Sequence, residues 1–128
     1  MGCGASRFVE VNGLRLHWAE WGAPARPLLL LLHSLAAHSH WWDWAAPLWA
    51  DRHHVVAPDF RGHGQSQWAS SYTFEDYAAD IARLLIEMAR EAVVVGHSMG
   101  AYVGAMLAAF RPDLVKGLVI ADMLTGWS

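Results

Sequence analysis

The segment Ala92-Val93-Val94-Val95-Gly96-His97-Ser98-Met99-Gly100 decides the fold. Its first four residues are an apolar run, which predicts a short strand over 92–95 that is covered on both faces of a sheet. The small residues of 99–110 predict a helix that Pro112 stops. The sequence Gly-x-Ser-x-Gly lies between the two, and in that context it predicts a sharp turn that exposes the serine.

The residue types at this turn have a physical reason. A serine in so tight a strand-to-helix turn adopts a strained backbone conformation, and its neighbours must be small for the turn to close. Gly96 and Gly100 meet that requirement. The turn also places the hydroxyl of Ser98 at the amino end of a helix, where free N–H groups stabilise a negatively charged oxygen. Ser98 is therefore the predicted nucleophile, and an incidental serine in a plain glycine turn is the alternative.

The rest of the chain alternates between strands and helices. Residues 7–11 and 14–21 alternate in character around Asn12-Gly13, the strongest short signal for a β-hairpin. Thr73 and the acidic residues after it predict the start of an amphipathic helix. After the hairpin, we predict buried strands over 28–32, 55–57, 92–95 and 118–121, and helices over 41–49, 74–90 and 99–110. This order predicts an α/β fold in which an antiparallel hairpin precedes parallel strands with flanking helices.

Three segments in register carry a family resemblance. The predicted buried strands lead into residues 33–35 (HSL), into residues 59–66 (DFRGHGQS) and into residues 96–100 (GHSMG). In order, spacing and strand context these segments resemble the α/β-hydrolase superfamily. The second of them is similar to the Asp-x-Arg-Gly-x-Gly-x-Ser loop of its esterase-like branch. The resemblance extends from the Asn12-Gly13 hairpin to Asp122.

The resemblance implies an enzyme, a serine hydrolase that needs no metal or other cofactor. Epoxide hydrolases and haloalkane dehalogenases of the superfamily use an aspartate nucleophile, so a serine favours esters, lactones, thioesters or the carbon–carbon bonds of dienones. The implied site residues are Ser98 as nucleophile, the backbone N–H groups of Leu35 and Met99 as oxyanion donors, and Gly96, His97 and Gly100 as the nucleophile elbow. The family usually has glycine where Ser34 stands, which predicts strain at Ser34 if that position needs a positive φ.

Other polar and aromatic residues have two interpretations each. Asp122 is a weak candidate for the triad acid, and a structural role at a strand end is the alternative. We expect His97 to pack away from the Ser98 hydroxyl and His33 to support the oxyanion loop, with base catalysis as the alternative for both. We also expect Asp59 and Arg61 to form an internal pair that braces their loop, with a direct catalytic role as the alternative. His63 is expected to make a local hydrogen bond. Trp41 or Trp42 is expected in the core or in the wall of an apolar substrate pocket.

The resemblance also implies that the chain is the N-terminal half of the fold. Family members order their triad as serine, acid and histidine, with the histidine after the eighth strand, whereas the chain reaches Ser128 just after its predicted sixth strand. We therefore expect residues 1–128 to form a partial core domain without the lid, acid and histidine region. Its predicted activity is weak hydrolysis of a small ester, lactone or related carbonyl substrate. The alternatives are a non-catalytic protein that binds a small ligand and an interaction protein that completes its sheet with a partner.

Composition and charge count against several other functional classes. The net charge of −3 and the scattered cations count against binding to nucleic acid. The eight histidines show no metal-ligand spacing, and the single Cys3 excludes an internal disulfide. The apolar run 27–32 is far shorter than the ~18 residues that a membrane span needs, so we expect a cytoplasmic protein. The apolar strand at 118–120 predicts self-association through an open sheet edge.

One targeting pattern is present at the start of the sequence. Residues 1–6 (MGCGAS) fit the loose pattern for N-myristoylation, and Cys3 is available for palmitate. An untethered N-terminus is the alternative.

Overall fold

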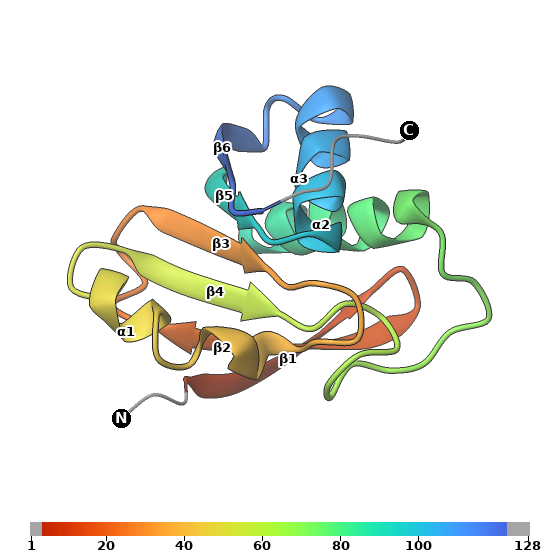
Figure 1. Ribbon diagram of the computed structural model, residues 1–128, viewed down its shortest axis with the longest axis horizontal. Helices are drawn as coiled ribbons and strands as arrows, with labels where there is room; N and C mark the ends of the chain where they lie inside the picture. Colours follow the sequence, from red (N-terminus) through yellow and green to blue (C-terminus); the bar gives the residue numbers. More distant parts are fainter. Residues whose placement is uncertain (1–3, 123–128) are drawn as a thin grey trace.

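The computed structural model describes residues 4–122, and its strands form one sheet in the order β1-β2-β4-β3-β5-β6 (Figure 1). Gly2 and Cys3, the two residues of the lipidation pattern that would carry lipid, and the terminal Ser128 lie outside these residues. The strands are β1 (Ala5–Val11), β2 (Leu14–Trp21), β3 (Leu28–Leu32), β4 (His54–Pro58), β5 (Ala92–Gly96) and β6 (Val115–Ile120). The predicted α/β fold class is confirmed.

The two halves of the sheet are paired as expected. β1 and β2 form an antiparallel hairpin, and β2 also pairs antiparallel with β4, whereas β4, β3, β5 and β6 run parallel to one another. The hairpin turns at Asn12 and Gly13, whose φ angles are 50° and 78°. Two successive positive φ angles are what the tight two-residue hairpin turn requires, and an Asn-Gly pair adopts them readily.

Helices cover both faces of the sheet (Figure 1). α2 (Phe74–Met88) and α3 (Met99–Phe110) lie on one face, and a 3₁₀ turn η1 (Ser39–Trp42) and α1 (Ala46–Trp49) lie on the other. The five leucines of β3 show the consequence of this layering. Leu28, Leu30 and Leu32 join the core under α2 and α3, and Leu29 and Leu31 join the core under η1 and α1. A strand that is buried on both faces has no polar side to alternate with, which explains its continuous apolar run.

Helix α2 begins at the predicted cap. The Thr73 side chain accepts a hydrogen bond from the N–H of Asp76, and the Asp76 side chain accepts one from the N–H of Thr73, which completes a capping box. The helix ends at Met88, because Ala89 adopts a left-handed conformation with φ 55°. The predicted end at residue 90 was therefore two residues late.

The predicted helix over 41–49 is wrong as a single element. The structure divides it into η1 and the one-turn α1, with a turn between them. Pro47 lies at the start of α1. Because proline has no N–H to donate and its ring clashes with the preceding turn, it kinks or breaks a helix from within, but it is well suited to the first turn of a new one.

Strand β6 is longer than predicted and lies at the edge of the sheet. It begins at Val115 and not at Leu118, because an edge strand is paired on one side only and tolerates polar residues such as Lys116. Val119 and Ile120 are 50% and 46% exposed. Within residues 4–122, no helix is long and apolar enough to cross a membrane.

Candidate active site

Ser98 occupies a strained turn between β5 and α3. Its backbone angles are φ 54° and ψ −113°, in a region that non-glycine residues rarely adopt. The neighbouring glycines are required by space. A Cβ atom on Gly100 would lie 2.1 Å from the carbonyl oxygen of Leu32, and one on Gly96 would lie 2.5 Å from the carbonyl oxygen of Gly100. The close approach of β3 to the first turn of α3 therefore demands glycine.

Backbone hydrogen bonds from two other strands hold this turn. The N–H of His97 donates to the carbonyl oxygen of Leu32 at the end of β3, with an N···O distance of 3.0 Å. The N–H of Ser98 donates to the carbonyl oxygen of Asp122, just after β6, at 2.7 Å. Met99 is the first residue of α3, so its N–H has no acceptor within the helix. The free donor beside the hydroxyl is therefore that of Met99 and not that of Ser98.

A pocket of about 360 Å³ opens beside Ser98 at the carboxyl ends of the parallel strands. It brings together three predicted site residues, Leu35, Ser98 and Met99. Aromatic side chains form the rest of its wall, and these are Tyr72, Phe74, Tyr77 and Tyr102. The pocket therefore combines a candidate nucleophile with an apolar, aromatic surface.

Sequence reasoning missed these aromatic residues as part of the site. Tyr102 lies four residues after Ser98, and this spacing places two residues on the same side of a helix, so it was available as a signal. Tyr72 and Phe74 flank the helix cap Thr73, but only the packing of α2 against α3 turns them toward Ser98. Phe74 and Tyr102 stack with ring centroids 6.1 Å apart and an angle of 25° between the planes.

His33 stabilises the loop after β3. Its ring is fully buried, with Nδ1 2.7 Å from the carbonyl oxygen of Ser34 and Nε2 accepting the N–H of Phe60 at 3.1 Å. A ring that donates from Nδ1 and accepts at Nε2 is the neutral tautomer. Burial lowers the pKa of His33 to about 4, consistent with this assignment. Both ring nitrogens are committed to the loop, as expected for a supporting residue.

The left-handed residue of this loop is Ala36 and not Ser34. The N–H of Ala37 donates to the carbonyl oxygen of Ser34 at 3.1 Å, and Ala36 has φ 62°. A type II turn, which is closed between residues i and i+3, has its positive φ at i+2. Ser34 is the first residue of the turn, so the strain that the glycine preference predicted at Ser34 falls two residues later. Leu35, the candidate oxyanion donor, is the second residue of the turn and is exposed.

The prediction that Asp59 and Arg61 pair with each other is wrong. The Asp59 carboxylate accepts the N–H of Ser39 at 2.6 Å and faces Nδ1 of His17, on β2, at 2.7 Å. Arg61 instead donates to both carboxylate oxygens of Asp80 on α2, at 2.7 and 2.8 Å. Two residues of one loop thus face different elements, and each finds its partner there.

The Asp59 carboxylate is buried, yet it remains ionised. Burial alone would raise the pKa of Asp59, but the N–H groups of Gln65 and Ser39 and the ring of His17 outweigh burial and hold the pKa below its usual range. In the same loop, Nδ1 of His63 bonds the carbonyl oxygen of Arg61 at 3.0 Å, which confirms the expected local hydrogen bond.

His97 packs against an aromatic ring. It stacks on Trp41 with ring centroids 5.5 Å apart and an angle of 21° between the planes, and its Nε2 lies 3.9 Å from the exposed carboxylate of Asp122. Packing is thus the observed contact of His97. Asp122 holds the Ser98 turn through its backbone, as a strand-end residue does, and its role as triad acid stays a prediction.

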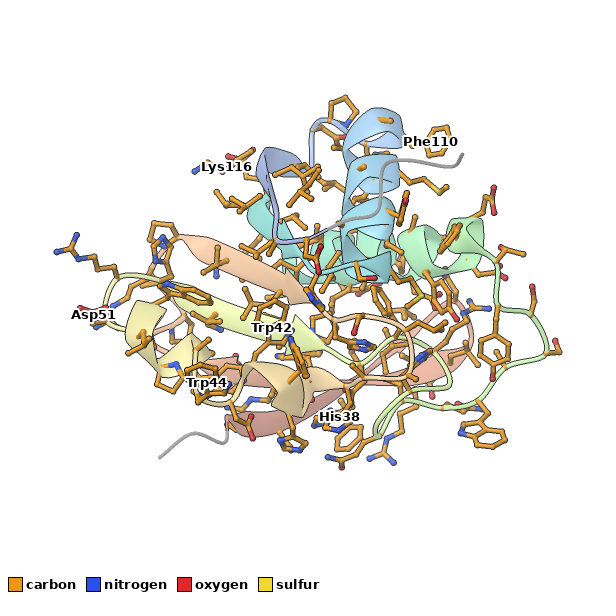
Figure 2. The ribbon with its side chains drawn as sticks, viewed as in Figure 1. His38, Trp42, Trp44, Asp51, Phe110 and Lys116 are labelled. Carbon is orange, nitrogen blue, oxygen red and sulfur yellow. The ribbon has the colours of Figure 1, made fainter. Side chains whose placement is uncertain are left out.

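Trp41 and Trp42 lie beside this site and not in its wall. The pocket wall that residues 4–122 provide does not include Trp41 or Trp42. A separate hollow of about 260 Å³ is lined by Trp41, Trp42, Trp44 and Ala45. Figure 2 shows Trp42 and Trp44 on the η1–α1 side of the sheet, and Trp42 is buried in the core there. In the described part of the chain, no cluster of three or more His, Cys, Asp or Glu is placed to hold a metal.

Comparisons with known proteins agree on one family. The alpha/beta hydrolase fold family matches residues 27–126. The 2-(acetamidomethylene)succinate hydrolase of Mesorhizobium japonicum is 38% identical over 119 residues, which cover 91% of this chain and 42% of that protein. Epoxide hydrolase A of Mycobacterium tuberculosis is 38% identical over 108 residues, which cover 80% of this chain and 34% of that protein.

A solved structure shows the same likeness in three dimensions. The thioesterase domain from the curacin biosynthetic pathway superposes with a TM-score of 0.89 at 32% identity, over 97% of this chain and 48% of that domain. The chain therefore spans less than half the length of the relatives that it matches.

Proposed function

The chain belongs to the α/β-hydrolase fold family, and on that premise we propose that Ser98 is the nucleophile of a hydrolase that acts on a small ester, lactone or related carbonyl compound. One observation carries the proposal. Ser98 stands in a strained turn, with φ 54°, at the amino end of α3, and it borders a pocket of about 360 Å³. Backbone strain of this kind persists only where the surrounding structure holds it, and strained residues cluster at active sites.

The proposed chemistry is acyl transfer through the serine. The Ser98 oxygen bonds to the substrate carbonyl carbon while its proton passes to a base, and the carbonyl oxygen gains the negative charge. The N–H groups of Met99 and Leu35 stabilise that charge, and one such donor is worth ~10²–10³ in turnover. The bond to the leaving group then breaks, the leaving oxygen takes the proton, and water releases the acyl group from Ser98.

The mechanism also needs a base that accepts the proton of the Ser98 hydroxyl. Among the described residues, no histidine forms a hydrogen bond with the Ser98 hydroxyl. His33 has both ring nitrogens engaged, and His97 faces Trp41 and Asp122. We therefore propose that full turnover depends on a base supplied from elsewhere. Serine proteases that lack a triad residue keep a rate enhancement of ~10³–10⁴ over the reaction in water, which comes from the oxyanion hole and substrate binding alone.

The relatives' names support hydrolysis but differ in the bond cleaved. They name a succinate-derivative hydrolase, an epoxide hydrolase and a thioesterase. The serine at position 98 supports acyl chemistry and not epoxide opening, because the family resemblance assigns an aspartate nucleophile to epoxide hydrolases. An ester, lactone or thioester substrate is consistent with an exposed serine and N–H donors that stabilise an oxyanion.

The test is covalent labelling with a fluorophosphonate, whose phosphorus bonds to an activated serine oxygen as fluoride leaves. Because no described histidine acts as the base, we expect slow labelling of the intact chain at high probe concentration and no labelling of Ser98→Ala. Ser70→Ala, which removes an exposed serine from the loop before α2, is the matched control and should label normally. A folded chain that remains unlabelled at Ser98 contradicts the proposal.

Two non-catalytic functions have observations in their favour. A ligand-binding protein fits the pocket together with a serine hydroxyl that no described histidine contacts. A sheet-completing interaction protein fits the edge strand β6, where Val119 and Ile120 are exposed. Light scattering at high concentration tests the second, because pairing through β6 predicts dimers or larger species.

A further inference from the structure

We infer that the pocket beside Ser98 selects a neutral, planar aromatic acyl group. This inference rests on the proposed function, because it names the substrate class for the same serine. Within residues 4–122 the pocket wall consists of Leu35, Tyr72, Phe74, Tyr77, Ser98, Met99 and Tyr102. Four of these side chains are aromatic and none is charged.

The rings form two walls. Phe74 at the start of α2 stacks on Tyr102 of α3, with planes 25° apart. Tyr72 lies 6.5 Å from Tyr77, centroid to centroid. Tyr72 and Phe74 are 44% and 46% exposed, so a bound ring would remove apolar surface from water. Aromatic side chains favour stacked or edge-on aromatic partners, which a flat ligand provides and a branched chain does not.

Two contacts hold the Tyr72 ring in its position in the wall. The Tyr72 hydroxyl accepts the N–H of Ala69 at 2.8 Å. A Cβ atom on Gly62 would lie 2.5 Å from the Tyr72 ring, so the ring packs directly on that glycine, which has φ 74°. A preformed wall loses little entropy when a ligand binds, which favours a defined ligand shape.

Tyr102 connects the aromatic walls to the reacting atom. It follows Ser98 by four residues, so it lies one helical turn away on the same side of α3. A ring packed against Tyr102 therefore lies in the same pocket that Ser98 borders. The volume of about 360 Å³ lies near the lower end of ligand pockets, which suits one ring and its carbonyl.

The charge distribution excludes an anionic acyl group from this wall. The nearby guanidinium of Arg61 already pairs with both oxygens of Asp80, lies 3.8 Å from Asp76 and donates to the carbonyl oxygen of Ser71. Among the described residues, the pocket wall offers a carboxylate no cation in place of the water that it would lose. The pocket thus differs from what a succinate-type substrate requires, although one relative is named for a succinate derivative.

Equilibrium binding of two stable amides tests the inference without requiring catalysis. The probes are benzamide, which is neutral and aromatic, and succinamate, which is anionic and aliphatic, titrated against the intact chain by ligand-observed NMR. We expect benzamide to bind and succinamate not to bind. Tyr102→Leu, which removes a ring but keeps an apolar side chain, should weaken benzamide about fivefold to tenfold.

The matched control is Phe110→Leu. Phe110 lies on the same helix at the end remote from the Ser98 turn and is exposed, so its replacement should leave benzamide binding unchanged (Figure 2). Tyr102→Phe keeps the ring and should restore binding, and far-ultraviolet circular dichroism verifies that each variant is folded. If Tyr102→Leu does not fold, Phe74→Leu removes the other ring of the stack and is expected to give the same loss.

The outcomes separate this inference from the proposed function. Benzamide binding that survives Ser98→Ala and depends on Tyr102, in a chain that no fluorophosphonate labels, refutes the serine nucleophile and retains the ligand class. Labelling at Ser98 together with equal or tighter binding of succinamate overturns the ligand class and retains the nucleophile. Benzamide binding that Tyr102→Leu and Phe74→Leu both leave unchanged also overturns the ligand class.

Discussion

The N–H of Ser98 donates a hydrogen bond to the backbone carbonyl oxygen of Asp122, at 2.7 Å. The bond joins the turn after β5 to the residue that follows the edge strand β6, two segments that are distant in sequence. It removes the Ser98 N–H from the set of oxyanion donors and leaves that of Met99 at the helix start. The position of β6 thereby controls the geometry of the candidate nucleophile.

Replacement of Asp122 tests this connection, because Asp122 has φ 83°. Glycine adopts a positive φ without strain, whereas a β-branched residue does so only at a cost of ~1–3 kcal/mol. We expect Asp122→Gly to keep labelling at Ser98 and Asp122→Val to slow it and to lower the free energy of unfolding. Equal labelling rates in the two variants would show that this strand end does not support the turn.

Gly100→Ala tests the close packing of β3 on α3. The added Cβ would lie 2.1 Å from the Leu32 carbonyl oxygen, so the backbone must move. We expect a loss of ~1–3 kcal/mol in unfolding free energy and loss of Ser98 labelling. The matched control is Gly117→Ala on β6, where the nearest atom would be 3.9 Å away and labelling should persist. Normal labelling of Gly100→Ala would contradict the geometry.

The buried, neutral ring of His33 should make the fold less stable in mild acid. Burial lowers the pKa of His33 from 6.5 to about 4, so the unfolded chain binds a proton at this site more readily than the folded chain does. Stability from the neutral ring is therefore present above pH 6.5 and decreases as the pH falls toward 4. Urea unfolding across this range should show that slope, and His33→Asn should reduce it. A slope unchanged by the substitution would assign the effect to another group.

The buried Asp59 carboxylate should cause a second loss of stability, at lower pH. Its pKa is lowered in the fold, because N–H groups and His17 outweigh its burial, so the unfolded carboxylate takes up a proton first as the pH falls. Its contribution is fully present above the ordinary aspartate pKa of about 3.9 and is lost below it. Asp59→Asn keeps the shape but not the charge.

Because Asp59→Asn leaves a buried hydrogen-bonding network incomplete, it should destabilise the chain by about 3 kcal/mol at pH 7. The substitution should also remove the pH dependence of the unfolding free energy below pH 4. Measured by urea unfolding, a variant as stable as the parent at pH 7 would refute the role of the network.

Local signals determined most of the secondary structure. The apolar runs of β3 and β5, the Asn12-Gly13 turn and the Thr73 cap each specify their element through residues that are near in sequence. The Gly-x-Ser-x-Gly segment likewise predicted the strand, turn and helix around Ser98. Prediction failed where a single residue divided an element, as Pro47 does, or where an edge strand lacked the buried pattern, as β6 does.

The sequence by itself thus determined the fold class, the strand order along the chain and the candidate nucleophile, because hydrophobic periodicity and turn chemistry act between neighbouring residues. Only the tertiary structure decided that Asp59 faces His17, that Arg61 faces Asp80, and that aromatic rings from α2 and α3 meet beside Ser98. These contacts join residues that are distant in sequence. Their geometry depends on how strands and helices pack against one another, which no local pattern encodes.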